Sequence, residues 1–95
     1  MIPVALNPAA VPVAIAGRGA VALRRFVALS AGGARDLLLF SDQPDQDLAR
    51  SAGDALREFL PGRPNLARLR ALWIAGLPDD RAAELAALAR SERVL

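Results

Sequence analysis

Short apolar runs alternate with longer segments of mixed polarity, and this pattern predicts an α/β fold. The runs at 12–17 (PVAIAG), 37–40 (LLLF) and 70–76 (RALWIAG) are short and almost continuously apolar. Such runs are typical of strands that are covered on both faces, as in a parallel sheet. Residues 56–60 (LREFL) alternate in polarity instead, and predict a third strand at a sheet edge, closed by PGRP at 61–64.

Helical patterns separate most of these predicted strands. Residues 20–31 have apolar positions on a wide face, and the paired glycines of the following SAGGAR are suited to a left-handed helix end. Residues 45–56 are weakly helical because Gly53 interrupts them. A third helix is expected to begin at Pro78, with two acidic residues in its first turn, and RVL at 93–95 resembles the start of another strand.

The predicted order is therefore β-α-β-α-β-β-α-β, which favours a Rossmann-like, doubly wound, mostly parallel sheet of four to five short strands. With 95 residues the chain is expected to form a single domain, 1–95, of the dinucleotide-binding kind. The strand that opens at RVL predicts that this domain is incomplete at its C-terminal end.

Composition narrows the class of protein. Apolar residues make up 54% of the chain and recur throughout, which argues against intrinsic disorder. No apolar stretch is long enough to cross a membrane, and Pro3, Pro8 and Pro12 interrupt the N-terminal apolar run, so neither a membrane partner nor a signal peptide is expected. The absence of cysteine fits a cytoplasmic protein. The net charge is only +2 and the arginines are spread out, so no nucleic-acid partner is expected.

The side-chain inventory excludes several kinds of chemistry. The chain has no His, Cys, Lys, Tyr or Thr, and all 12 basic residues are Arg. Its serines therefore lack an ordinary base to activate them, and neither zinc nor another metal site is expected. No catalytic residue can be named from the sequence. A nicotinamide enzyme escapes this limit, because the cofactor carries the hydride chemistry and the protein mainly orients it.

One motif points to a cofactor. Gly17, Gly19 and Ala22 form G-x-G-x-x-A between a predicted strand and a predicted helix, which is the dinucleotide-binding pattern. The helix N-terminus would face the diphosphate, and Asp42, after the second strand, would bind the ribose 2′-hydroxyl. A carboxylate there repels a 2′-phosphate, so NAD is expected rather than NADP. Alternatively, the glycines only make a tight turn, Asp42 serves a turn or a helix cap, and Arg18 is solvated instead of reaching a phosphate.

The segment VAIAGRGAVALRRF resembles the N-terminal domain of the siroheme synthase family, the precorrin-2 dehydrogenases and sirohydrochlorin ferrochelatases. The most specific part is Gly-x-Gly-x-Val-Ala-x-Arg-Arg at 17–25. IPVALNP at 2–8, AGGAR at 31–35, LWIAGLPDD at 72–80 and LARSERVL at 88–95 follow the family's order more loosely. The resemblance implies an NAD-dependent oxidoreductase of siroheme, and so porphyrin, biosynthesis. It would have a tetrapyrrole substrate and would be a dimer or another homo-oligomer.

The resemblance also implies a set of cofactor-binding positions. Together with the glycine motif, these are Gly17, Arg18, Gly19, Ala20, Val21, Ala22, Asp42, Gly76 and Asp79. The family's middle glycine is Arg18 here, and its threonine before the acidic pair is Pro78. The family's key aspartate is expected beyond Leu95. Two alternatives therefore stay open: a dinucleotide-binding domain of a precorrin-2 dehydrogenase-like enzyme, or a non-catalytic binding or oligomerisation module that has lost its cofactor.

Overall fold

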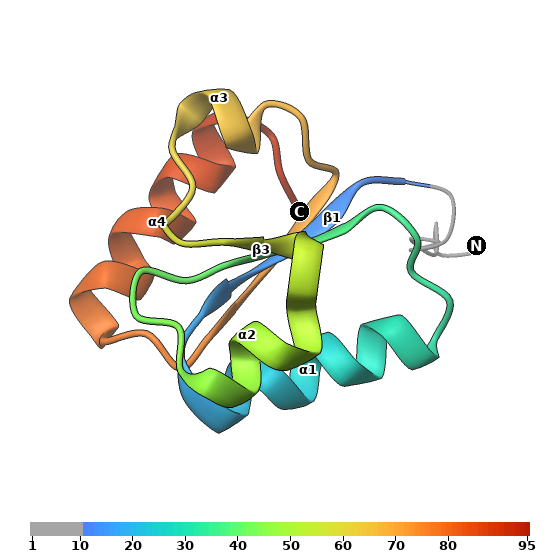
Figure 1. Cartoon of the computed structure of the whole chain (residues 1–95). Coiled ribbons are helices and arrows are strands. Elements are labelled where there is room, and N and C mark those ends of the chain that lie inside the picture. The colour runs from blue at the N-terminus through green and yellow to red at the C-terminus, as the bar shows by residue number, and fades with distance from the viewer. Residues whose placement is uncertain (1–10) are drawn as a thin grey trace, which may run out of the picture.

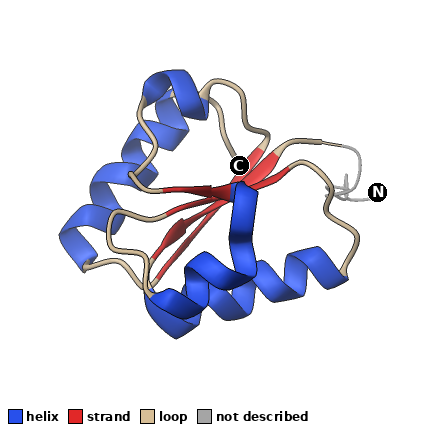
Figure 2. Ribbon diagram, in the orientation of Figure 1, coloured by secondary structure: helices blue, strands red, loops and turns tan. Residues whose placement is uncertain are grey.

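A computed structural model describes residues 11–95, which form a four-stranded parallel sheet with helices on both faces (Figures 1 and 2). The strands are β1 (Val13–Gly17), β2 (Leu37–Phe40), β3 (Leu56–Arg57) and β4 (Ala71–Ala75). Their order across the sheet is β3-β2-β1-β4, and every pairing is parallel. The predicted Rossmann-like α/β fold is thus confirmed, with four strands.

Two helices cover each face of the sheet. The helices α1 (Gly19–Ala31) and α2 (Gln46–Ala52) pack together on one face, and a 3₁₀ turn, η1 (Gly53–Ala55), follows α2. The helices α3 (Arg63–Leu66) and α4 (Asp79–Ser91) lie on the other face, as Figure 1 shows. None of the helices in residues 11–95 has both the length and the apolar character that crossing a membrane requires.

The central strand β1 supplies both hydrophobic cores. Val13 and Ile15 face α1 and α2, whereas Ala14 and Ala16 face α3 and α4, and all four side chains are fully buried. This alternation explains why the sequence of β1 is continuously apolar: a strand with helices on both faces has no position that faces solvent. The run LLLF of β2 is covered on both faces for the same reason.

The segment between β2 and β4 differs from the sequence prediction. The predicted strand 56–60 is reduced to Leu56–Arg57, although it does lie at the edge of the sheet. The predicted closing turn PGRP instead leads into α3, whose first turn contains Pro64 and whose start is stabilised by a hydrogen bond from Gly62 N to Asn65 Oδ1 (2.9 Å). The segment 58–70, which includes this short helix, carries the chain across the sheet from β3 at one edge to β4 at the other.

The remaining boundaries follow the predictions closely. Helix α1 ends before Gly32, and the next residue, Gly33, has the expected left-handed conformation (φ 98°). Leu95 pairs with the edge of β4 in the parallel pattern: its N–H donates to Arg70 O and its carbonyl accepts from Leu72 N. The segment IPVALNP, with Pro3 and Pro8, lies outside the described residues.

Candidate functional site

The carboxyl ends of β1 and β4 lie side by side, and the strand order reverses between them. In chain order β1 is followed by β2 and β3 on one side, whereas β4 lies on the other side of β1. The loops after β1 and β4 therefore leave in opposite directions, to α1 on one face and to α4 on the other. Open α/β sheets bind their ligands at such a topological switch point.

Main-chain contacts hold these two loops together. Arg18 N donates a hydrogen bond to Ala75 O (3.1 Å). A Cβ atom on Gly17 would overlap the same carbonyl oxygen, and a Cβ atom on Gly76 would overlap Arg18 O. Gly17 and Gly76 are therefore required for the close approach of neighbouring backbones. The turn at Gly17 is thus built partly for strand packing, whatever it binds.

The start of α1 has the features of a phosphate-binding turn. Gly19, its first residue, has φ 68°, and no atom lies within 4 Å of where its Cβ would be. Ala22 is fully buried, and its Cβ lies 3.1 Å from the position that a Cβ on Gly17 would occupy. A small third residue is thus needed for helix and strand to pack closely, as in dinucleotide-binding folds.

At the N-terminus of α1, no side chain offsets the free N–H groups and the positive end of the helix dipole, as side chains do at the starts of α2 and α4. Asp45 caps α2 by accepting a hydrogen bond from Leu48 N (2.8 Å), and α4 carries Asp79 and Asp80 in its first turn. Helix α1 has neither a side-chain cap nor an acidic residue in its first turn. Its first N–H groups and the positive end of its dipole therefore favour an external anion.

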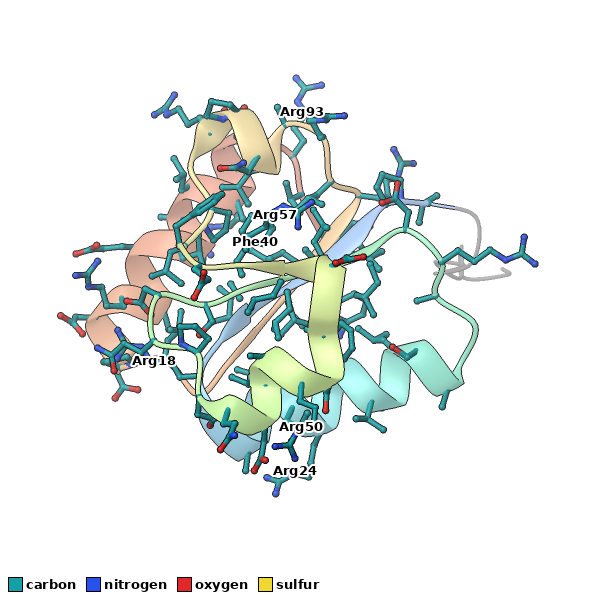
Figure 3. The ribbon with its side chains drawn as sticks, viewed as in Figure 1. Arg18, Arg24, Phe40, Arg50, Arg57 and Arg93 are labelled. Carbon is teal, nitrogen blue, oxygen red and sulfur yellow. The ribbon has the colours of Figure 1, made fainter. Side chains whose placement is uncertain are left out.

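Arg18 and Asp42 form a two-pronged ion pair beside this turn. Arg18 Nε donates to Asp42 Oδ1 (2.8 Å), and Arg18 Nη2 donates to Asp42 Oδ2 (2.7 Å). Their side chains are 22% and 27% exposed, so the pair is accessible from solvent. Figure 3 shows Arg18 near the start of α4, away from Arg24 and Arg50. The Arg18 side chain is thus held by Asp42 rather than extended into solvent.

The ion pair shifts the protonation equilibria of both partners. Hydrogen bonds from Arg18 hold the pKa of the Asp42 carboxyl below its usual value, although partial burial opposes this. The positive charges of Arg18 and Arg81 lower it further. In the same way, the hydrogen bonds to Asp42 raise the pKa of Arg18, with a further contribution from Asp80. Both members are therefore charged throughout the neutral range.

This lowered pKa predicts how the stability contribution of Asp42 depends on pH. Because its pKa is lower in the folded than in the unfolded protein, the contribution is complete above about pH 4 and is lost as pH falls through the folded value. We expect the difference in unfolding free energy between the wild type and Asp42→Asn to stay constant from pH 8 to pH 5 and to shrink below pH ~4. Urea unfolding at each pH measures it, and a difference that grows on acidification would contradict the lowered pKa.

The other predicted site residues occupy different environments. Ala20 and Val21 are exposed in the first turn of α1, and Gly76 contacts the Arg18 backbone. Asp79 is exposed at the start of α4. Its neighbour Asp80, rather than Asp79, is the residue whose negative charge raises the pKa of Arg18.

Sequence reasoning did not single out Asp80 or Arg81 as part of this charged cluster. The available signal was that the loop after β4 ends at the same edge of the sheet as the turns after β1 and β2. Charged residues at all three positions could have been grouped on that basis.

A cavity of about 560 Å³ adjoins the switch point on the α1 face. Its lining includes Val21, Arg24 and Arg25 of α1 and Trp73, with Gly76 at the end of β4. Sequence analysis alone did not foresee this cavity, because it depends on how α1 lies against the β4 edge.

Comparison with known proteins adds no relative: neither a protein-family model nor a curated protein matches the chain. The geometry described above is therefore the basis for assigning a function. Among residues 11–95, no group of three or more His, Cys, Asp or Glu residues is placed to hold a metal ion.

Proposed function

We propose that this chain binds a nicotinamide dinucleotide, NAD, at the β1–α1 turn and serves as the cofactor domain of an oxidoreductase. The observation that carries the proposal is the position of Asp42, 24 residues after Arg18 in the sequence. Its carboxylate is within hydrogen-bonding distance of the side chain at the centre of the glycine motif. The acid expected to bind the ribose and the turn expected to bind the diphosphate therefore adjoin each other.

The residues present fit such a ligand. The uncapped N–H groups of α1 would bind the diphosphate, and the open space above Gly19 would let it approach the backbone. Asp42 would accept hydrogen bonds from the ribose, and the loop from Gly76 to Asp79 would face the nicotinamide half. Ala20, Val21 and Ala22 complete the first turn. When bound, the nicotinamide ring supplies the hydride chemistry, which this chain's own side chains lack.

The resemblance to the siroheme synthase family gives this proposal a specific form. The substrate would be the tetrapyrrole precorrin-2, oxidised with NAD in siroheme biosynthesis, in a cytoplasmic homo-oligomer. A second candidate is a non-catalytic oligomerisation module. It is favoured by Val21 and Val27, which are 48% and 51% exposed on α1, and by the cavity between α1 and Trp73, which a partner could fill.

Thermal unfolding in the presence of NAD tests the proposal. NAD at 100 times its Kd adds about 2.7 kcal/mol to the unfolding free energy, which raises the Tm by roughly 10–20 °C for a domain of this size. We expect Gly19→Ala, which puts a methyl group above the turn, to reduce this shift. Gly33→Ala is the matched control, because Gly33 also has a positive φ and open space but lies at the other end of α1.

The two functions give different outcomes in this experiment. No Tm shift with millimolar NAD would refute dinucleotide binding. If sedimentation also showed a stable oligomer that is indifferent to NAD, the second candidate would be supported. A monomer that NAD stabilises would exclude that candidate.

A further inference from the structure

The ion pair between Arg18 and Asp42 retains the capacity to bind a ligand. A guanidinium group carries five N–H donors and a carboxylate has about four lone-pair sites. The pair uses two donors and two acceptor sites, one on each carboxylate oxygen. Asp42 can therefore still accept hydrogen bonds from a ribose, and Arg18 can donate to a phosphate, while the pair stays intact.

Arg18 also changes the charge that a ligand meets at the end of β2. An isolated carboxylate there repels a 2′-phosphate, and this repulsion underlies the usual preference for NAD. Here the guanidinium lies 2.7 Å from the carboxylate and cancels its charge at close range. The neighbouring charges do not restore a net negative charge at this position. The negative charge of Asp80 raises the pKa of Arg18, and the positive charge of Arg81 lowers the pKa of Asp42, so one acidic and one basic neighbour accompany the pair.

The two residues are held at the site independently of any ligand. Arg18 is the N-cap residue of α1, and its backbone N–H is bonded to β4. Asp42 lies two residues after the end of β2, and the N–H of the residue between, Ser41, donates to Arg57 O (2.9 Å). The backbone positions from which the two side chains extend are thus set by strand and loop contacts rather than by a ligand.

We propose that Arg18 is a specificity-determining residue that offsets the rejection of 2′-phosphate by Asp42, so that the site accepts NADP as well as NAD. This inference rests on the proposed dinucleotide function and extends it from one cofactor to two. The adenosine ribose of either cofactor would bind the same pair. The free hydroxyls would donate to Asp42, and a 2′-phosphate would accept from the remaining N–H groups of Arg18.

Titration calorimetry with NAD and with NADP at one fixed salt concentration tests the inference. For the wild type we expect the two Kd values to agree within about tenfold. Arg18→Gln, which removes the charge but keeps a long polar side chain, should weaken NADP relative to NAD by about tenfold or more. Asp42→Asn should shift the ratio by a similar factor in the opposite direction. Arg90→Ala, an exposed position in the last turn of α4, is the control and should leave the ratio unchanged.

Failure of this inference is distinguishable from failure of the proposed function. If the wild type binds NAD but rejects NADP, and Arg18→Gln does not alter the ratio, Arg18 does not set specificity while NAD binding stands. If the wild type binds neither cofactor, both the function and the inference are refuted. Circular dichroism of each variant identifies any loss of folding, and Arg18→Lys, which keeps the charge, should then retain the wild-type ratio.

Discussion

Replacement of Gly17 by alanine is expected to lower the unfolding free energy by about 3 kcal/mol or more. The added Cβ would overlap the carbonyl oxygen of Ala75, a main-chain atom that cannot rotate away. Relief would require β1 and β4 to separate at their carboxyl ends, which would break the hydrogen bond from Arg18 N to Ala75 O. Urea unfolding followed by circular dichroism measures the loss.

Gly62→Ala is the matched control for this variant. Gly62 has φ −98°, and a Cβ there would meet Pro64 and Asn65 at ordinary contact distances of 3.8 and 3.9 Å. We therefore expect a loss of about 1 kcal/mol or less at Gly62, mainly because alanine is a poor helix N-cap. Equal losses in the two variants would show that Gly17 is not required by its contact with β4.

Most of the fold could be predicted because the strong signals were local. The continuous apolar runs of β1, β2 and β4 are necessary in strands that have helices on both faces, and each was recognised within one or two residues. The start of α4 was signalled by Pro78 and two acidic residues. In each case the residues that determine the element lie within it or next to it.

The segment with weak local signals was predicted less well. LREFL alternates in polarity like a strand, yet β3 contains only Leu56 and Arg57. Phe59 instead packs its ring edge-on against Phe40, with 5.7 Å between the ring centroids, and this contact joins segments that are distant in sequence. Helix α3 was missed because it has only four residues and its start depends on Asn65, three residues beyond Gly62. A tertiary contact outweighed periodicity after β3, whereas a local hydrogen bond determined the start of α3.

The candidate site was predicted in its positions but not in its contacts. The motif predicted that Gly17 and Gly19 lie at the turn between a strand and a helix and that Asp42 follows the next strand, and the elements have these places because the spacing of a βαβ unit determines which ends of strands meet. It could not reveal that Arg18 turns toward Asp42. The direction of a long side chain depends on what lies opposite it in three dimensions. The two alternatives considered for Arg18, a phosphate contact and a solvated loop position, did not include this ion pair.

The same geometry couples the position of the Arg18 backbone to the position of its charged side chain. The main chain of Arg18 is fixed between β1 and β4, while its side chain reaches in the other direction, toward the end of β2. Displacement of the Arg18 backbone would therefore disturb both the packing of the loops and the charge presented to a ligand. A substitution in the loop that follows β4 can test this link without altering any charged residue.

Gly76→Ala is that test, and we expect it to cost about 2–5 kcal/mol of unfolding free energy. The left-handed φ of 78° contributes about 1–2 kcal/mol of strain for a residue with a Cβ. The overlap of this Cβ with Arg18 O adds about 1–3 kcal/mol. Since relief would move the N-cap of α1, the NAD-dependent shift in Tm should also decrease.

Gly19→Ala separates the two contributions, because Gly19 has a similar φ of 68° but no atom within 4 Å of the added methyl group. Its loss of stability should therefore contain the strain alone, about 1–2 kcal/mol. The excess loss in Gly76→Ala measures the contact between the two loops. If both variants lose the same free energy, the loops are free to separate at Arg18, and the switch point is not fixed by backbone contact.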